Sequence, residues 1–505
     1  MGLTGKVYLV GAGPGDAGLL TMRGAELLRR ADVVVYDSLV NRELLALAPE
    51  AAEVIFGGKR PRDRAIPQEE LNRLLAEKAA AGKTVVRLKG GDPYIFGRGG
   101  EEAAGLHRDG VPFEVVPGIS SIIAAPSYAG IPLTHRDHCS SFTVITGHED
   151  PGKEESALDW ERIAREPGTK VFLMGVERIG KIAAALEANG LDAGTPVAMV
   201  RWGTMGRQKT ITGTLATIAD KVAMADFKAP AVTIIGGVST LRDTLNWFEN
   251  RPLFGQRVVV TRTRNQASRL SGQLRDLGAD VLEIPTIKIV PPGSNEPIVE
   301  AVTGIGSYDW IVFTSPNGVE HFFDYFFKAF RDVRDLGCVR FAAVGPATAK
   351  KLGELHLHID LMPEVYTAEA TAKALLDHQN VENISVLLAR AEEANSELPR
   401  MLEDRGAIVD DVAFYKTIPE TEDRNGAAED FEENGADWIM FASSSAVKNF
   451  DARFNLAKRC EDNPKLKLAS IGPETTKALK ELGLKPTAKA RDHTIDGLAA
   501  ALLKK

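Results

Sequence analysis

The chain has 505 residues, too many for a single hydrophobic core, and we expect about three or four domains. With 44% hydrophobic and 26% charged residues, it has the composition of an ordinary globular protein, which excludes the fibrous and intrinsically disordered classes. The net charge of −8 argues against a general nucleic-acid binder, because such proteins are usually basic. An anionic ligand would therefore need a local basic patch.

The cysteines and the hydropathy pattern indicate the cellular compartment. Cys139, Cys338 and Cys460 lie far apart and form no C-x-x-C pair, so we expect neither a disulfide framework nor structural zinc. We assign no metal to His135 and His138, because no other ligand cluster supports one. The amino-terminal residues lack the features of a signal peptide, and no run approaches the ~18 apolar residues of a membrane span. These features predict a cytoplasmic protein without a membrane partner.

The first predicted strand ends in a glycine-rich turn, VYLVGAGPGD at 7–16. Without side chains, such a turn lets a ligand approach the backbone. The dinucleotide fingerprint needs a third glycine where this chain has Asp16, and a P-loop needs a Gly-Lys-Ser/Thr sequence that does not follow. An acidic residue would also repel a pyrophosphate. The turn therefore favours a neutral or cationic ligand, although a glycine-rich turn is often only a turn.

Between residues 7 and 240, short apolar segments alternate with helix-like segments, which predicts an α/β architecture with mostly parallel strands. Ligand sites on such sheets lie in the loops at strand ends. After the first strand, we expect strands at 33–36, 84–88, 142–146, 170–174, 196–200 and 231–235. The strand-end loops with unusual composition are 36–38, 57–60, 90–93 and 117–121.

The segment 57–64 carries four basic residues, Lys59, Arg60, Arg62 and Arg64. A short basic run is most often a solvated surface. This run, however, follows a Gly-Gly turn in an acidic protein, which is where a polycarboxylate substrate would need to be neutralised. The residues alone are compatible with both interpretations.

Five motifs lie in the first 245 residues: VGAGPGD at 10–16, YDSLV at 36–40, VRLKGGDPYIFGRGGEE at 86–102, VVPGISS at 115–121 and GIPLTHR at 130–136. Together they resemble the motifs of uroporphyrinogen-III C-methyltransferases. The resemblance implies a two-domain tetrapyrrole methyltransferase fold at 1–245 that binds S-adenosylmethionine between its domains, usually as a homodimer. It also implies methylation of uroporphyrinogen III at two ring carbons, which gives precorrin-2.

The same resemblance implies roles for individual residues. It places the general base at Asp37 and the general acid at Lys59, and we assign Arg60 and Arg62 of the basic segment to the substrate. Ser120 and Ser121 stand where the family often has Thr-Ala. The implied cofactor-binding residues are Pro14, Gly90, Gly91, Asp92, Ile95, Ser120, Ser121, Met174, Gly203 and Ala231.

The chemistry of methyl transfer agrees with these roles. Transfer to a pyrrole-derived carbon needs an electrophilic sulfonium, an electron-rich ring and a base for the proton that is lost afterwards. Asp37 lies at the end of a predicted strand, which suits that base. An aspartate before a helical segment is also a common helix N-cap, so Asp37 has a second, structural interpretation. The missing third glycine is also understandable, because S-adenosylmethionine has no phosphate.

The second half follows a linker at 246–254 and contains an internal duplication. Trp247 and Phe248 in the linker predict a packed connector. DWIVFTSPNGVEHF at 309–322 recurs 128 residues later as DWIMFASSSAVKNF, and VGPATAKKLGE recurs 127 residues later as IGPETTKALKE. These offsets are far longer than a solenoid repeat, so we expect two similar α/β units that face a cleft.

Loops with hydroxyl side chains follow the predicted strands of both units, at 314–315, 345–348, 443–445 and 472–476. Hydroxyls and backbone amides at strand ends can bind carboxylates with little fixed charge. Serine or threonine before a helix also commonly serves as an N-cap. The two roles can coexist at one residue.

The paired FTS/FAS and GP-x-T loops resemble uroporphyrinogen-III synthases over 255–505. The resemblance implies a two-domain flavodoxin-like fold with discontinuous subdomains, about 255–287 with 418–505, and 288–417. The duplication alone would predict two consecutive units. The family closes linear hydroxymethylbilane into uroporphyrinogen III with inversion of the last pyrrole ring, without a metal or cofactor.

In this half, the resemblance implies substrate-binding or catalytic roles for Thr348 in GPATAK and Tyr415 in VAFYKT. Tyr415 also fits a half-buried strand aromatic, which is the commoner role of such a residue. The reaction rests mostly on holding a flexible substrate in one folded shape. Further pocket residues that we assign to the substrate are Arg262, Thr314, Ser315, Ser444 and Thr475.

The two halves together predict a bifunctional enzyme of sirohaem or cobalamin synthesis. The second half would make the macrocycle and the first half would methylate it twice, so the partners would be small-molecule tetrapyrroles. Two other hypotheses compete with this one. In one, the first half methylates a later corrin intermediate. In the other, the second half is a non-catalytic tetrapyrrole-sensing module.

Overall fold

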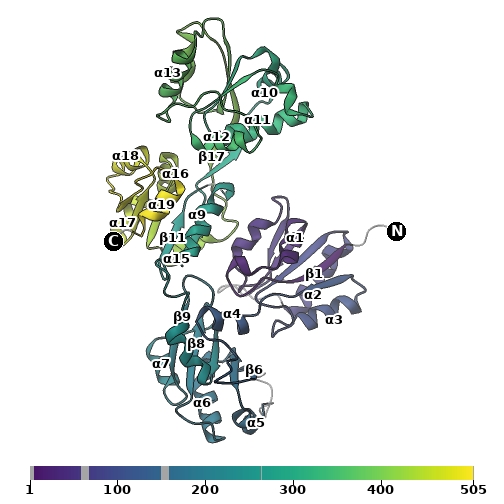
Figure 1. The fold of residues 1–505 in the computed structure, drawn as a ribbon. Coiled ribbons are helices and arrows are strands. Elements are labelled where there is room, and N and C mark those ends of the chain that lie inside the picture. The colour runs from purple at the N-terminus through teal and green to yellow at the C-terminus, as the bar shows by residue number, and fades with distance from the viewer. Residues whose placement is uncertain (1–4, 59–66, 149–157, 263, 504–505) are drawn as a thin grey trace. The chain divides into compact units, whose positions relative to one another are not determined.

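The computed structural model describes residues 5–58, 67–148, 158–262 and 264–503. Within these ranges the strands form five-stranded sheets with helices on their faces, which confirms the α/β class (Figure 1). The chain divides into two compact units, one formed by Met1–Ile284 with Glu422–Lys505 and the other by Pro285–Thr421. No helix in the described ranges combines the length and the apolar composition that crossing a membrane requires.

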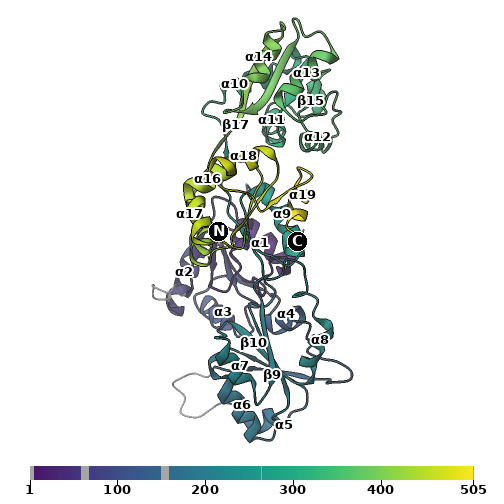
Figure 2. The ribbon, with the colours of Figure 1, turned by 90° about the vertical axis from the view of Figure 1, so that its left-hand side faces the viewer.

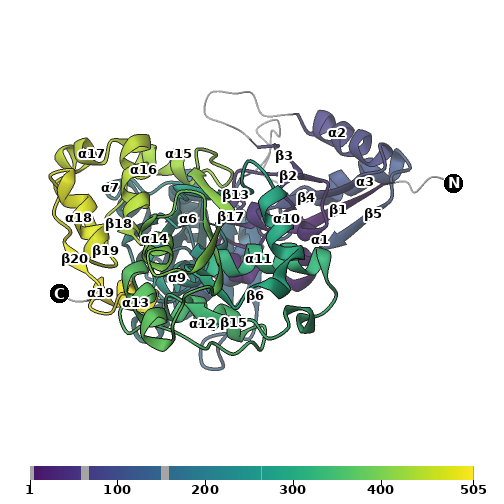
Figure 3. The same ribbon diagram turned by 90° about the horizontal axis from the view of Figure 1, so that it is seen from above.

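The first sheet is entirely parallel, with the strand order β3-β2-β4-β1-β5. Val7 and Leu9 of β1 pack under α2 and α3, while Val10 packs under α1, so this apolar strand is buried on both faces (Figure 3). The strands are β1 (Lys6–Gly11), β2 (Val33–Tyr36), β3 (Glu53–Phe56), β4 (Thr84–Lys89) and β5 (Phe113–Val116), and the helices are α1 (Met22–Arg29), α2 (Gln68–Ala80) and α3 (Gly99–Arg108).

The second sheet has the order β6-β7-β10-β8-β9, and only β6 and β7 are parallel to each other. Helices α5 to α7 cover one face and α4 packs on the other (Figure 2). The strands are β6 (Phe142–Thr146), β7 (Thr169–Leu173), β8 (Pro196–Arg201), β9 (Lys209–Thr214) and β10 (Ala231–Ile235), and the helices are α4 (Ser121–Tyr128), α5 (Trp160–Arg165), α6 (Ile179–Ala188), α7 (Ile218–Met224) and α8 (Arg242–Leu245).

Strand direction in the second sheet corrects the sequence-based expectation. The predicted strands are present, with ends that shift by no more than one residue. The prediction of mostly parallel strands is wrong for this sheet, and β9 was missed. The segment 202–208 between β8 and β9 is short, and a short connection joins antiparallel neighbours, whereas parallel neighbours need a long crossover.

The connector after α8 is packed. The ring of Phe248 lies 4.8 Å from the ring of Tyr128 in α4 and 5.5 Å from that of Phe254, and Phe248 is only 4% exposed. The indole nitrogen of Trp247 also donates to the carbonyl oxygen of Ser127. These contacts tie the connector to the second sheet's helix layer.

The third sheet is parallel throughout and has the order β12-β11-β18-β19-β20, so it joins strands that are far apart in the sequence. Its strands are β11 (Arg257–Val260), β12 (Asp280–Glu283), β18 (Trp438–Phe441), β19 (Lys467–Ser470) and β20 (Ala488–Lys489). Its helices are α9 (Arg264–Asp276), α15 (Ala427–Asn434), α16 (Ser444–Phe454), α17 (Leu456–Asp462), α18 (Pro473–Glu481) and α19 (Ile495–Ala501).

The fourth sheet has the order β13-β17-β16-β14-β15 and is parallel except for the β13–β17 pair. Helices α10 to α12 cover one face, and α13 and α14 cover the other (Figure 1). The strands are β13 (Ile287–Val290), β14 (Trp310–Phe313), β15 (Arg340–Ala343), β16 (Ser385–Ala391) and β17 (Ile408–Pro419). The helices are α10 (Glu296–Thr303), α11 (Pro316–Ala329), α12 (Pro346–Gly353), α13 (Ala368–His378) and α14 (Glu397–Glu403).

The duplicated segments form the same strand–helix unit in the third and fourth sheets. Ser315 caps α11 by accepting a hydrogen bond from the amide of Gly318 at 3.0 Å. Ser443, the residue 128 positions later, caps α16 by accepting one from the amide of Ala446 at 3.2 Å. The capping interpretation is therefore confirmed for these two serines.

Three glycines bring the loops of the first sheet into backbone contact. A Cβ atom on Gly118, in the loop after β5, would lie 2.2 Å from the carbonyl oxygen of Gly91 and 2.7 Å from the Cα of Gly11. Both neighbours are backbone atoms, which cannot rotate away as a flexible side chain could. These loops therefore keep their spacing only while the position holds glycine.

We expect Gly118→Ala to lower the free energy of unfolding by about 1–3 kcal/mol, because the methyl group must push two loops apart. Thermal and urea unfolding of the full chain would measure the loss. Gly100→Ala is the matched control, because no described atom lies within 4 Å of a Cβ on this residue of α3. Alanine there should preserve or raise stability. A Gly118→Ala variant as stable as the unsubstituted protein would contradict the close-contact argument.

Candidate active site

Three loops meet at the carboxyl end of the first sheet. The amide of Gly91 donates to the carbonyl oxygen of Gly13 at 2.7 Å, and the amide of Gly13 donates back to Gly91 at 3.2 Å. The Asp92 carboxylate accepts a hydrogen bond from the amide of Gly118 at 2.9 Å. The loops after β1, β4 and β5 are thus fixed to one another by backbone groups and one carboxylate.

These loops line a cavity together with loops of the second sheet. Met174, just after β7, and Ile95 are apolar side chains that are 50% and 40% exposed. All ten residues that the sequence assigned to the cofactor line this cavity, namely Pro14, Gly90, Gly91, Asp92, Ile95, Ser120, Ser121, Met174, Gly203 and Ala231. The fold thus brings together residues that are up to 217 positions apart in the chain.

Asp16 links the first glycine-rich loop to the second sheet. Its carboxylate accepts hydrogen bonds from the amide of Gly18 at 2.8 Å and from the hydroxyl of Tyr128 at 2.7 Å. Its own amide donates to the hydroxyl of Thr204 at 2.9 Å. Burial and the Asp16 carboxylate both raise the pKa of Tyr128, so its hydroxyl stays a donor. Sequence reasoning missed Tyr128 and Thr204, because no local pattern marks them.

Asp37 lies in the loop after β2 and lines the same cavity. Its carboxylate accepts hydrogen bonds from the amide of Leu39 at 3.1 Å and from the amide of Gly90 at 3.2 and 3.3 Å. The helical turn that follows, Arg42–Leu47, is capped by Asn41. The N-cap interpretation of Asp37 is therefore wrong, and its side chain, 26% exposed, is held by backbone amides at the cavity wall.

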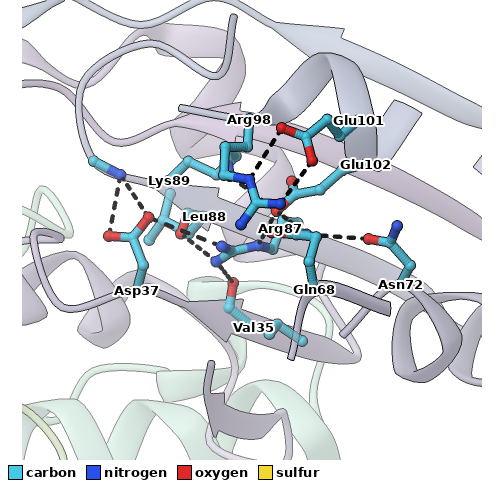
Figure 4. Close-up of polar contacts among 11 residues, drawn as sticks. Val35, Asp37, Gln68, Asn72, Arg87, Leu88, Lys89, Arg98, Glu101 and Glu102 are labelled. Atoms are coloured by element: carbon cyan, nitrogen blue, oxygen red, sulfur yellow. Dashed lines mark hydrogen bonds and ion pairs between the residues drawn. The ribbon is translucent and has the colours of Figure 1, made fainter. Parts of the chain in front are cut away.

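A buried charge cluster lies beside Asp37 (Figure 4). Arg87 and Lys89, at the end of β4, are 4% and 3% exposed, and Glu102 of α3 is fully buried. Burial and the charge of Arg87 lower the pKa of Lys89, while the carboxylate of Glu102 opposes this shift. Sequence reasoning missed the cluster, although charges at alternate positions of the apolar strand sequence VVRLK were a usable signal.

The roles assigned to the basic segment remain predictions. Lys59, Arg60 and Arg62 lie outside the described residues, between β3 and α2. Among the described residues, no group of three or more His, Cys, Asp or Glu side chains is arranged to hold a metal ion. Cys139 instead contacts the hydroxyl of Thr169 at 3.1 Å.

In the second half, the residues assigned to the substrate occupy equivalent helix starts. Thr348 in α12 and Thr475 in α18 are both 3% exposed. Thr314, Ser315 and Ser444 are half-buried. Each lies at the carboxyl end of a strand or in the first turn of the helix that follows, as the strand-end argument predicted.

Tyr415 has features of a buried strand aromatic and also of a residue that acts on the substrate. It lies in β17 and is 6% exposed, so it is a buried strand aromatic. Its hydroxyl, however, lies 2.9 Å from the hydroxyl of Ser315, and its ring stacks on His321 at 5.6 Å. Burial raises the pKa of Tyr415, which favours the neutral phenol. The register between β16 and β17 shifts just before Tyr415, and such irregularities re-aim side chains.

Arg262 and its counterpart in the duplication differ. Arg390, 128 positions later, is 4% exposed and forms an ion pair with Asp411 within the fourth sheet. Arg262 follows β11, is half-buried, and has a pKa that burial lowers. Arg390 therefore has a structural role, while the role of Arg262 stays a prediction.

Comparison with known families divides the chain in the same place as the motifs do. Residues 6–219 match the family described as Tetrapyrrole (Corrin/Porphyrin) Methylases. Residues 268–500 match the family described as Uroporphyrinogen-III synthase HemD. The two matches do not overlap, so each half of the chain has its own family.

Individual relatives cover the methylase half or the whole chain. The S-adenosyl-L-methionine-dependent uroporphyrinogen III methyltransferase of Methanosarcina barkeri is 52% identical over 48% of this chain and 94% of that protein. The uroporphyrinogen-III C-methyltransferase of Bacillus subtilis is 45% identical over 66% of this chain and 68% of that protein. The porphyrin biosynthesis protein HemD of Ruminiclostridium josui is 39% identical over 99% of this chain and 98% of that protein. Because this last match runs through both halves, the chain belongs to the family of porphyrin biosynthesis proteins in which a uroporphyrinogen-III C-methyltransferase is fused to a uroporphyrinogen-III synthase.

Proposed function

We propose that this chain carries out two consecutive steps of tetrapyrrole synthesis. Residues 255–505 close hydroxymethylbilane into uroporphyrinogen III with inversion of the last ring. Residues 1–245 then transfer two methyl groups to uroporphyrinogen III, giving precorrin-2, and 246–254 link the two enzymes. The observation that carries the methyltransferase assignment is the gathering of all ten predicted cofactor residues and Asp37 around one cavity.

The cavity fits S-adenosylmethionine, the cofactor of the methyltransferase half. Its wall includes Gly13, Gly15 and Gly91, whose positive φ angles of 79°, 147° and 68° favour glycine, so the backbone there carries no side chains. The exposed apolar surfaces of Ile95 and Met174 suit an adenosyl group. The carboxylate of Asp16 accepts hydrogen bonds from Tyr128 and Gly18, and because neither donor carries a charge the loop keeps an acidic wall, which suits a cationic sulfonium. When bound, the cofactor supplies an electrophilic methyl group.

The chain's own residues then handle the substrate. We infer that Asp37, fixed by the amides of Leu39 and Gly90, takes the proton that the tetrapyrrole loses after methyl transfer. Lys59 is the proposed general acid, and Arg60 and Arg62 are proposed to bind substrate carboxylates. The backbone amides hold the Asp37 carboxylate still, which reduces the reorganisation that proton transfer requires.

The synthase half needs no cofactor in this proposal. Tyr415 and Thr348 assist loss of the hydroxyl group, and the flexible substrate is held in one folded shape by Arg262, Thr314, Ser315, Ser444 and Thr475. The hydroxyl of Tyr415, bonded to Ser315 and kept neutral by burial, suits a hydrogen-bond donor to the leaving group.

The proposed subdomains of the synthase half are about 255–287 with 418–505, and 288–417. We further infer a homodimer formed through the methyltransferase half, tetrapyrroles as the only ligands besides the cofactor, and a cytoplasmic location. The net charge of −8 supports the absence of a nucleic-acid partner. Three widely separated cysteines support a reducing compartment.

The substrate assignment is tested by supplying uroporphyrinogen III and S-adenosylmethionine with a labelled methyl group. We expect two labelled methyl groups per tetrapyrrole and a product with the mass of precorrin-2. No uptake of label would instead favour a methyltransferase that acts on a later corrin intermediate. Heat-denatured protein is the control for non-enzymatic transfer.

Asp37→Asn should retain binding of S-adenosylhomocysteine and lose most methylation, about 10²–10⁴-fold in kcat, because the amide cannot accept the ring proton. Calorimetric titration and a radiolabel assay would measure the two quantities. Asp32→Asn is the matched control, since Asp32 precedes β2 at its other end, where its carboxylate accepts a hydrogen bond from the amide of Thr84. Unchanged turnover in Asp37→Asn would remove Asp37 from the catalytic residues.

Tyr415→Phe should slow uroporphyrinogen III formation by about tenfold, since it removes one hydrogen bond to the substrate. Separation of the type I and type III isomers after incubation with hydroxymethylbilane would measure the effect. Tyr308→Phe is the control, because it removes a hydroxyl that bonds Asp410 in the same unit. If the unsubstituted chain yields only the type I isomer, the second half is a sensing module and not a synthase.

A further inference from the structure

The end of β4 carries two buried cations that have no role in the proposed reaction so far. Arg87 and Lys89 lie on the same face of β4 as Val85, because alternate residues of a strand point to one side. Helices α2 and α3 cover this face of the first sheet with apolar side chains. Glu102, from the first turn of α3, is their buried counterion. A buried ion cluster is rarely the most stable solution, because apolar residues of similar volume often serve as well or better. Stability is therefore a weak explanation for these charges.

One oxygen of Glu102 holds the cluster together. Oε1 accepts hydrogen bonds from Lys89 Nζ at 2.9 Å, from Gln68 Nε2 at 3.1 Å and from Arg87 Nε at 3.3 Å (Figure 4). Oε2 has no hydrogen-bond partner among the described residues and is buried. A single buried carboxylate therefore joins both cations, and Arg87 is held in addition by the carbonyl oxygens of Val35 and Leu88.

The cluster reaches Asp37 through β4 and β2. Arg87 Nη2 lies 3.9 Å from Asp37 Oδ2, and Arg87 Nη1 donates to the carbonyl oxygen of Val35, two residues before Asp37. Gly90, the residue after Lys89, donates its amide to both oxygens of the Asp37 carboxylate. Arg87, Lys89 and Asp37 all line the cavity.

We propose that Glu102 is a positioning residue for methyl transfer, whose buried carboxylate holds Arg87 and Lys89 in place, so that Asp37 faces the tetrapyrrole as an oriented carboxylate. This proposal rests on the proposed role of Asp37 as the base. In the intact cluster two cations face two carboxylates. Without the charge of Glu102, two buried cations share the partly exposed carboxylate of Asp37 alone, and either of them can leave its position.

The direction of the pH effect follows from the groups around Lys89. Burial and Arg87 lower the pKa of Lys89, whereas Glu102 and Asp37 raise it. The other charged groups at the start of α3 are Arg98 and Glu101, which pair with each other. Removing the charge of Glu102 therefore lowers the pH at which Lys89 becomes neutral, and the cationic form persists only below that pH.

The test is Glu102→Gln in the full chain, assayed for kcat and KM with uroporphyrinogen III across pH, at saturating S-adenosylmethionine. We expect kcat to fall by about tenfold to a hundredfold, with KM and S-adenosylhomocysteine binding nearly unchanged. The alkaline limb of kcat should move to lower pH. Glu114→Gln is the matched control, because Glu114 also holds two cations, Lys6 and Arg23, but at the surface of β5. A wild-type kcat and pH profile in Glu102→Gln would overturn the proposal.

A double variant separates positioning from folding. Glu102→Gln with Lys89→Met removes the charges of the buried pair, which is often neutral for stability. If Glu102 acts only structurally, a double variant that melts at the wild-type temperature should recover wild-type kcat, and that result would overturn the proposal. We expect it to remain impaired, because Arg87, the cation 3.9 Å from Asp37, no longer has the carboxylate that holds it.

Asp37→Asn, assayed alongside, separates the proposed role of Asp37 as the base from the proposed role of Glu102 as a positioning residue. If it retains activity, the role of Asp37 as the base fails, and the positioning role of Glu102 fails with it. If it loses activity while Glu102→Gln keeps the wild-type kcat and pH profile, only the inference about Glu102 fails.

Discussion

The close approach of three backbone loops is the constraint on which the methyltransferase site depends. At Gly118 a Cβ would lie 2.2 Å from the carbonyl oxygen of Gly91, so the loops cross only where no side chain intervenes. The paired hydrogen bonds of Gly13 and Gly91 and the bond from Gly118 to Asp92 then fix that crossing. Because the first sheet's cofactor residues lie on these loops or next to them, the crossing sets one wall of the cavity.

Charge is distributed around this wall in two different ways. Near the first loop, the carboxylate of Asp16 is held by two uncharged hydrogen-bond donors, which leaves an acidic surface that suits a cationic cofactor. Near Asp37, two cations are buried and face the carboxylates of Glu102 and Asp37. Burying ions costs desolvation energy and so lowers stability. Active sites commonly retain such destabilising groups because the reaction needs them. The same cavity thus has an acidic cofactor side and a substrate side with buried cations.

In the synthase half, duplication produced two similar units that have since diverged in chemistry. Both use a serine after the strand to cap the next helix. In one copy the capping hydroxyl of Ser315 also contacts Tyr415, whereas in the other the hydroxyl of Ser443 contacts Ser445. One oxygen can accept from a backbone amide and still bond a second hydroxyl. The alternatives of capping and ligand binding are therefore compatible at Ser315.

The sequence by itself determined the α/β class, the position of most strands, the family of each half and the loops that line the cavity, because glycine turns, apolar runs and motifs are local signals. Tertiary structure decided the rest. The antiparallel second sheet depends on how β8, β9 and β10 pair, and the orientation of the Asp37 carboxylate depends on the amide of Gly90, which belongs to another loop. The cluster of Arg87, Lys89 and Glu102 forms only because α3 packs on β4, and no local periodicity encodes that long-range contact.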